Sequence, residues 1–269
     1  MEKIIVLGTG TASVTNNFNT CFILENDSQE YLLVDTGGGN QILKQLKLAN
    51  ININNIHNVF ISHKHLDHLL GMLWIYRYVD LSMARGTYTG NLDIYCHDEV
   101  AEILKTQIKT LLRKSQQQFL DKRIFIHTVK NNEKIKILNY DIEFLDIFSK
   151  SDKQFGFKTR LNNGKVLAFL GDEPLDENLY NDVKNADYLL HEAFCLETED
   201  SIFKPREKNH DTVKSACIKA ENLGIKNIVL WHTQENLGEK RKELYTKEAK
   251  ANFSGNVIVP NDLEIIPLN

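Results

Sequence analysis

The chain has 269 residues, of which 42% are hydrophobic and 25% charged, and its formal net charge at pH 7 is −4. This length and composition suit an α/β fold with a sizeable core. The acidic balance argues against a global attraction to nucleic acid or anionic membranes. The four cysteines include no Cys-x-x-Cys pair, which indicates buried thiols in a reducing compartment. Without a signal-peptide pattern or a membrane-length apolar run, we expect a cytoplasmic protein.

Hydrophobic periodicity alternates along the chain between the periods of strands and helices, about two and about 3.6 residues. It predicts strands at 3–7, 21–25, 31–34, 59–62, 92–96 and 124–129, with helices at 41–49, 66–79 and 98–118. A second series has strands at 142–147, 156–160, 166–170, 188–191, 227–231 and 257–259, with helices at 175–184, 212–223 and 239–250. Asp211 is expected to cap the helix from Thr212, which Gly224 ends. The two series predict one domain, residues 1–269, with two sheets inside and helices outside.

The densest chemical signal directly follows the apolar run 59–61 and consists of His63, His65, Asp67 and His68. Neutral imidazole and carboxylate are the ligands that borderline and hard divalent metals prefer. His63 and His65 alternate, so an extended segment sends both side chains the same way. Asp67 and His68 are adjacent and begin the next predicted helix, so they point elsewhere. One pair can therefore serve one metal and the other pair a second metal close by.

Three further polar residues follow predicted strands directly or within two residues. Asp35 ends the run 31–34, Asp172 comes after the run 166–170 and Gly171, and His232 comes after the run 228–231. Each of them alone is typical of a turn or cap residue. Because α/β folds build their sites at the carboxyl ends of strands, together with the histidine cluster they form a constellation.

This ordered set of residues resembles the metallo-β-lactamase superfamily of metal hydrolases, and within it the ribonuclease Z branch. The opening Leu7–Thr11 looks like that branch's first strand and turn. Leu189–Phe194 matches its His-Glu-Ala block, and Asn209–Thr212 is similar to its Gly-His-Ser-Thr block. The resemblance covers nearly the whole chain. It implies an α/β fold of the four-layer αββα sandwich type and a metal-dependent hydrolase.

The resemblance also implies a role for each matching residue. His63 and His65 would bind a first metal; Asp67, His68 and His232 would bind a second, with Asp172 bridging both. Water activated between the metals would be the nucleophile, with Asp67 orienting it and accepting its proton. His210 would protonate the leaving oxygen or steady the pentacovalent phosphorus, with Glu192 setting the tautomer of its ring. Asp35 would support the histidine cluster from behind.

The chain departs from this family in the first metal site. The family supplies a third histidine from the strand before a Phe/Tyr-Gly-Phe/Tyr block, which here is Phe155–Phe157, and residues 145–152 contain no histidine. By position the expected ligand falls at Phe148, whose phenyl ring cannot coordinate a metal. Alternative donors in this stretch are Asp146, Ser149 and Asp152. We therefore expect the second site to fill first and the first site to be weak or empty.

A second departure concerns the substrate. Ribonuclease Z enzymes usually carry a long arm that clamps transfer RNA, between the Phe-Gly-Phe-like strand and the bridging aspartate. Here residues 158–165 read as a tight hairpin turn, and no arm is visible. Because a phosphate backbone is bound largely through cations, the acidic net charge also disfavours RNA. The Gly8-x-Gly10-x-x-Ser13 run lacks the third glycine of a dinucleotide fingerprint, so no nucleotide cofactor is expected.

These observations favour a phosphodiesterase or related ester hydrolase that acts on a small soluble substrate. One alternative is a ribonuclease Z-like RNA 3′-processing endonuclease without the arm. The other is a non-catalytic metal or ligand-binding protein with a degraded first site. The expected cofactor is one or two divalent cations, with zinc the first choice and manganese or iron as alternatives. We expect no membrane partner, and the apolar helix after the metal loop is compatible with a homodimer.

Overall fold

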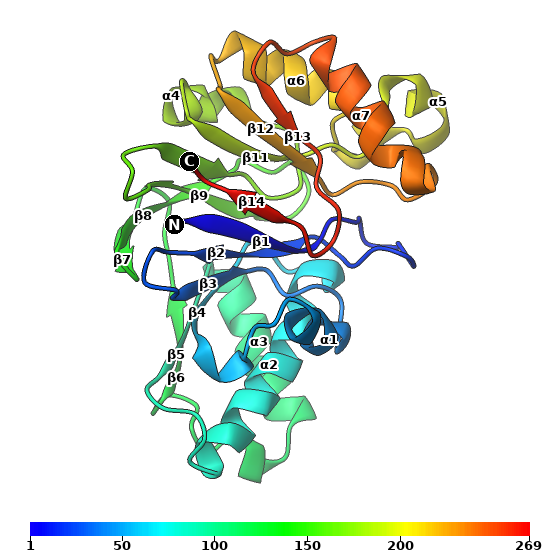
Figure 1. Ribbon diagram of the computed structural model, residues 1–269. Helices are drawn as coiled ribbons and strands as arrows, with labels where there is room; N and C mark the ends of the chain where they lie inside the picture. The colour runs from blue at the N-terminus through cyan, green and yellow to red at the C-terminus, as the bar shows by residue number, and fades with distance from the viewer.

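Two seven-stranded sheets form the centre of the structure, a computed structural model that describes residues 1–269 (Figure 1). The first sheet has the order β14-β1-β2-β3-β4-β5-β6. Its strands β3 to β6 are parallel, whereas β1 is antiparallel to both neighbours. The bounds are β1 (Lys3–Gly8), β2 (Cys21–Glu25), β3 (Tyr31–Val34), β4 (Ile56–Ile61), β5 (Leu92–Cys96), β6 (Ile124–Thr128) and β14 (Ile265–Pro267).

The second sheet has the order β13-β12-β11-β10-β9-β8-β7, and its strands β10 to β13 are parallel. Strands β9 and β10 are joined by the tight hairpin expected at this position, closed by the Leu161 N–H donating to the Lys165 carbonyl. The bounds are β7 (Lys134–Ile137), β8 (Tyr140–Asp146), β9 (Phe155–Arg160), β10 (Val166–Phe169), β11 (Tyr188–Glu192), β12 (Asn227–Trp231) and β13 (Asn256–Ile258).

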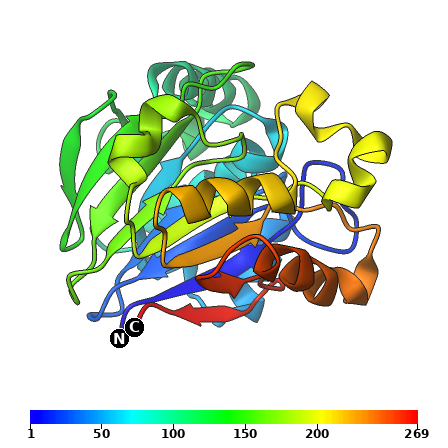
Figure 2. The same ribbon diagram turned by 90° about the horizontal axis from the view of Figure 1, so that it is seen from above.

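Helices cover the outer face of each sheet (Figures 1 and 2). The first sheet carries α1 (Gln41–Leu48), α2 (Leu66–Ala84) and α3 (Asp98–Leu111), and the second carries α4 (Tyr180–Val183), α5 (Asp200–Phe203), α6 (Val213–Asn222) and α7 (Arg241–Lys250). The two termini lie close together, beside the pairing of β1 with β14. The predicted four-layer αββα sandwich is confirmed.

Three buried clusters fill the spaces between these layers. The cluster between the two sheets is rich in aromatic side chains, including Phe22, Phe169 and Trp231, whose rings contact one another. One aliphatic cluster lies under α1 to α3 and the other under α6 and α7. The central strands thus bury one face against the opposite sheet and the other against helices, which explains their near-continuous apolar runs in the sequence.

Several boundaries differ from those predicted. The helix predicted over 98–118 ends at Leu111, and most of the helix predicted over 175–184 is a loop and a short 3₁₀ turn before α4. Thr212, not Asp211, caps α6, because its side chain accepts a hydrogen bond from the Ser215 N–H. The short strands β7 and β14 were not predicted. None of the helices is both long and apolar enough to cross a lipid bilayer.

Candidate metal centre

The carboxyl ends of the parallel strands in both sheets bring the sequence-predicted residues to one place. Asp35 follows β3, His63 follows β4 after one residue, and His232 follows β12. Asp172 lies three residues beyond the end of β10. Three groups of side chains could each hold a metal ion, because their donor atoms, one from each residue, lie within 4.8 Å of one another. The groups are His63, His65 and Asp172; Asp67, His68 and His232; and Glu192, His210 and His232.

Asp172 lies at the centre of these groups. One of its carboxylate oxygens, Oδ2, is 3.4 Å from each of three imidazole Nε2 atoms, those of His63, His68 and His232. Burial opposes the ionisation of Asp172, but His63 and the other imidazoles outweigh it and place the pKa of this carboxyl well below its ordinary value. The carboxylate is therefore available as a ligand.

The donor set fits a divalent cation. Ligand atoms about 2.1 Å from a tetrahedral cation lie about 3.4 Å from one another, which matches the separations around Asp172. In addition, His68 Nε2, His232 Nε2 and Asp172 Oδ1 are buried without any hydrogen-bond partner. Since buried polar atoms are normally paired, these atoms point to a ligand that completes the site.

Asp35 orients the imidazoles of both groups from behind. Its Oδ2 accepts hydrogen bonds from His68 Nδ1 at 2.8 Å and from the Ser62 hydroxyl at 2.7 Å. Ser62 Oγ in turn lies 2.9 Å from His63 Nδ1. Because the Nδ1 atoms of both histidines are engaged in this way, both Nε2 lone pairs are left for a cation.

Two backbone features place these side chains. Asp35 and His232 both have left-handed conformations, with φ of 56° and 53°, which cost energy in non-glycine residues and cluster at functional sites. Helix α2 approaches the loop after β3 so closely that a Cβ at Gly71 would lie 1.9 Å from the Thr36 carbonyl oxygen. This glycine therefore lets the start of α2 bring His68 to Asp35.

The first group is more open than the second. His65 is about 39% exposed at its side chain, whereas Asp67, His68 and His232 are buried. His65 Nδ1 lies 2.9 Å from His63 Nε2, and its other ring nitrogen is 3.1 Å from an oxygen of Asp152. Asp152, one of the alternative donors considered from the sequence, therefore contacts the outer nitrogen of His65.

Phe148 does not lie in the metal cavity. The residue is 42% exposed and lines the neighbouring cavity, whereas Ser151 and Gln154 from the same loop line the metal cavity. The carboxylate of Glu173 determines this course of the loop, because it accepts hydrogen bonds from the Ser149 and Ser151 hydroxyls and the Lys150 N–H. The position predicted for the missing histidine therefore points elsewhere.

His210 and Glu192 lie beside the metal ligands. His210 Nδ1 is 2.8 Å from the Asp172 carbonyl oxygen and 3.7 Å from Glu192 Oε2, so the carbonyl rather than Glu192 sets the tautomer of the ring. Phe194 stacks on the imidazole, with ring centroids 4.4 Å apart. Glu192 accepts a hydrogen bond from the Asp211 N–H. Burial lowers the pKa of His210 to about 4 and raises that of Glu192 well above its ordinary value.

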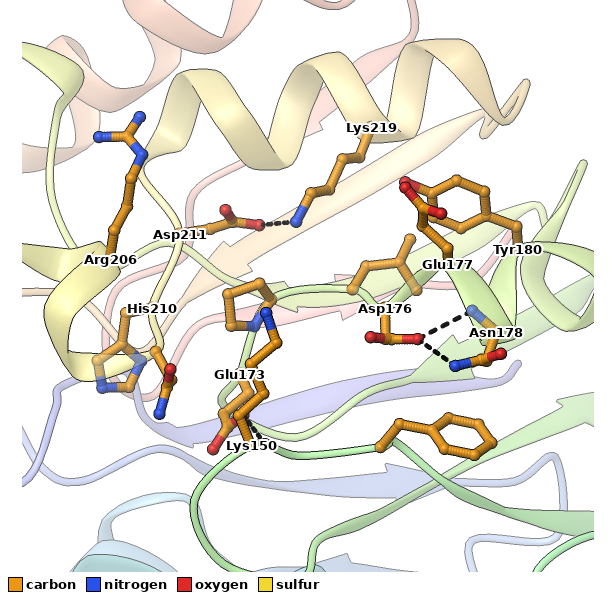
Figure 3. A pocket seen from close by; sticks show the side chains of 14 residues that line it. Lys150, Glu173, Asp176, Glu177, Asn178, Tyr180, Arg206, His210, Asp211 and Lys219 are labelled. Atoms are coloured by element: carbon orange, nitrogen blue, oxygen red, sulfur yellow. Dashed lines mark hydrogen bonds and ion pairs between the residues drawn. The ribbon is translucent and has the colours of Figure 1, made fainter.

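Two adjoining cavities give access to the centre. The metal cavity, of about 410 Å³, is lined by His65, Asp67, Asp172, His210, His232 and residues of the loop after β1. The second cavity, of about 620 Å³, shares Glu173 and His210 with it and extends past Lys150 towards Asn178 and Tyr180 (Figure 3). Both volumes are of the size that binds small molecules.

Sequence reasoning missed Ser62, Gln154 and Glu173. Ser62 and Glu173 carry a local signal, since each is adjacent to a predicted ligand. Gln154 carries none, because its place in the cavity depends on the course of the 147–154 loop.

The family described as anti-Pycsar protein Apyc1 matches residues 2–243 of this chain. The chain belongs to this family. Beyond the Apyc1 family, a ribonuclease Z from Nitrosopumilus maritimus is 25% identical, the alignment covering 97% of this chain and 98% of that protein. A ribonuclease Z from Ligilactobacillus salivarius is 23% identical, with coverages of 94% and 93%.

Solved structures share the fold of this Apyc1 family member. The metallo-β-lactamase fold protein YhfI from Bacillus subtilis is 20% identical with a TM-score of 0.78, covering 98% of each chain. The short form of human tRNase Z is 18% identical with a TM-score of 0.75, covering 99% of each chain. A diphosphatase of the PhnP family has 16% identity and a TM-score of 0.73, covering 98% of this chain and 96% of that one. The predicted resemblance to the ribonuclease Z-like branch of the metallo-β-lactamase superfamily is confirmed by these relatives and by the shared fold.

Proposed function

We propose that this protein is a divalent-metal-dependent phosphodiesterase that acts on a small soluble phosphodiester or related ester. The observation that carries the proposal is the buried group around Asp172, in which Asp172 and His232 have unpartnered donor atoms and line a cavity of about 410 Å³. The ribonuclease Z relatives and the PhnP-family diphosphatase agree with phosphoester chemistry. The short β9–β10 hairpin, in place of an extended arm, favours a small substrate.

The proposed ligands follow the two groups. His63, His65 and Asp172 would hold the first cation, and Asp67, His68 and His232, with Asp172 shared, would hold the second. Imidazole with carboxylate suits zinc first, with manganese and iron as alternatives. When bound, the cations polarise the phosphoryl oxygen and lower the pKa of water from about 15.7 towards about 7.

The chain's own residues would then position the reactants. Burial disfavours the ionised carboxyl of Asp67, but His68 and His232 outweigh it and lower its pKa, so the group is ionised and can orient the attacking water by accepting a hydrogen bond from it. We assign the proton that this water loses to the same carboxylate. His210 presents Nε2 to the cavity, because its Nδ1 donates to the Asp172 carbonyl, and the form protonated at Nε2 would assist departure of the leaving oxygen. Glu192 fixes the backbone of Asp211, the residue after His210.

RNA 3′ processing is the second candidate function. It is favoured by the ribonuclease Z relatives, which this chain matches over nearly its whole length. It is disfavoured by the net charge of −4, since a phosphate backbone is bound largely through cations.

A substrate panel separates these possibilities. The purified protein, loaded with Zn²⁺, Mn²⁺ or Fe²⁺, is incubated with bis(p-nitrophenyl) phosphate, a transfer RNA precursor and simple carboxylic esters. We expect hydrolysis of the small phosphodiester that is abolished by chelation and restored by metal. Accurate 3′ trimming of the RNA would instead support the second candidate. If no substrate is hydrolysed with any metal, the proposal is contradicted and the alternative of a non-catalytic binding protein is supported.

The two groups should differ in metal affinity. We expect calorimetric titration of the metal-free protein with Zn²⁺ to give two steps, the tighter one belonging to Asp67, His68, His232 and Asp172. This group offers four buried donors, whereas the first offers three, of which His65 is only partly buried. His65→Ala should remove the weaker step alone. Two equally tight steps, or loss of the tighter one in this variant, would contradict the assignment.

A further inference from the structure

Gln154 is a buried glutamine that lines the metal cavity but belongs to neither group of proposed metal ligands. It ends the 147–154 loop and precedes β9. Its backbone is fixed on both sides, because its carbonyl accepts from the Ile147 N–H and the next residue donates to the Ser62 carbonyl. Since Ser62 adjoins His63, these bonds attach Gln154 to the end of β4, beside the first group of metal ligands.

The structure orients the amide of Gln154. The side-chain Oε1 lies 3.5 Å from the Asp172 N–H, which donates to it. Gly171 makes room for this contact, since a Cβ there would lie 2.9 Å from the same oxygen. The opposite orientation would set the amide N–H₂ against the N–H of Asp172, donor against donor. The side-chain oxygen is therefore the atom that accepts the hydrogen bond from Asp172, and the amide nitrogen Nε2 remains available to a ligand.

Nε2 of Gln154 has no hydrogen-bond partner, although the residue is completely buried. Leaving a buried donor without an acceptor destabilises the protein, so an acceptor from outside the chain is expected. A cation cannot satisfy it, because an amide nitrogen offers no lone pair. An anion with oxygen acceptors can accept a hydrogen bond from Nε2. The amide would be a donor to this anion in a cavity whose lining also contains the carboxyl groups of Asp67, Asp172 and Glu173.

We propose that Gln154 Nε2 donates a hydrogen bond to a non-bridging oxygen of the phosphodiester bound in this cavity. This inference rests on the proposed function. Negative charge is present on these oxygens throughout the reaction, and a donor held in a fixed position favours the charged, crowded transition state. The amide would then act on the substrate beside the metal group that has no third histidine.

The test compares Gln154→Leu and Gln154→Glu with the wild type, all metal-loaded. Leucine removes the donor, and glutamate keeps the size but places a carboxylate oxygen where the donor stood. We expect kcat on bis(p-nitrophenyl) phosphate to fall about 10²-fold in both, with the metal content unchanged. Inorganic phosphate, measured by calorimetry, should bind more weakly to both. Gln107→Leu is the matched control, because it removes another amide with a buried unpartnered atom, its Oε1, in α3, and should change neither.

The outcomes separate this inference from the proposed function. If the wild type hydrolyses the diester and either variant retains its rate within about threefold, the hydrogen bond is absent and only this inference fails. If either variant loses metal in proportion to its activity, Gln154 is a metal ligand and the inference also fails. If the wild type hydrolyses no diester with any metal, the proposed function fails and this inference with it.

Discussion

Asp172→Asn is expected to lower phosphodiester turnover by at least about 10³-fold. The carboxylate oxygen that faces three imidazole nitrogens at 3.4 Å becomes part of a neutral amide. The change removes the negative charge that both groups of ligands share, so metal should be lost along with activity. The measurements are kcat/KM on bis(p-nitrophenyl) phosphate and the metal content by elemental analysis.

The fold should survive this change. Asparagine is close to isosteric with aspartate, and the Asp172 carbonyl that engages His210 belongs to the backbone. Asp141→Asn, at an exposed position in β8, is the matched control and should leave both readouts unchanged. A folded Asp172→Asn protein with wild-type metal content and rate would refute the shared role of this carboxylate.

The constellation around Asp172 could be predicted because its members carry local signals. His63, His65 and His68 are close in sequence, and Asp35, Asp172 and His232 each stand just beyond an apolar run. Parallel strands place such positions at one edge of a sheet, so strand prediction alone brings them near one another. The structure brings all six together as predicted.

The loop over 147–154 could not be predicted in the same way. Its course depends on Glu173, more than 20 residues further along the chain, which accepts hydrogen bonds from Ser149, Lys150 and Ser151. Counting positions from the Phe-Gly-Phe block cannot reveal such contacts. The sequence therefore predicts the position of the missing ligand at Phe148, which lies outside the metal cavity, and gives no signal for Gln154, which lines it.

The errors in the fold have a similar origin. Strand β14 is three residues long, and its pairing with β1 comes from the opposite end of the chain. The segment 175–184 shows the apolar periodicity of a helix. Its buried residues Leu175 and Leu179, however, lie in a loop and in a 3₁₀ turn. Hydrophobic periodicity alone predicts which side chains are buried more reliably than it predicts the secondary structure of the segment.

Asp35→Asn is expected to lower the affinity of the second metal site by about 10–100-fold. Asp35 accepts a hydrogen bond from His68 Nδ1, which leaves His68 Nε2 free for a cation. In the variant, the Ser62 N–H would retain the amide oxygen of the new side chain, so its N–H₂ group would face His68 Nδ1 and stabilise the opposite tautomer. The proton would then sit on Nε2, where the metal must bind. Calorimetric titration of the metal-free protein with Zn²⁺ measures the effect.

The side chain rather than the backbone should account for this loss, because asparagine tolerates the φ of 56° at this position. Without metal, burial opposes protonation of His68, but Asp67 and Asp35 outweigh it and raise the pKa of His68, so its imidazole is protonated and paired with Asp35. The metal-free variant should therefore also be less stable to denaturant by about 3–5 kcal/mol, since the change removes one charge of this buried pair. The same change in the half-exposed Asp93–His127 pair should cost less than about 1 kcal/mol and leave metal binding unaltered. If Asp35→Asn bound Zn²⁺ as tightly as the wild type, the tautomer of His68 would not depend on Asp35, and the second site would owe its affinity to the ligands alone.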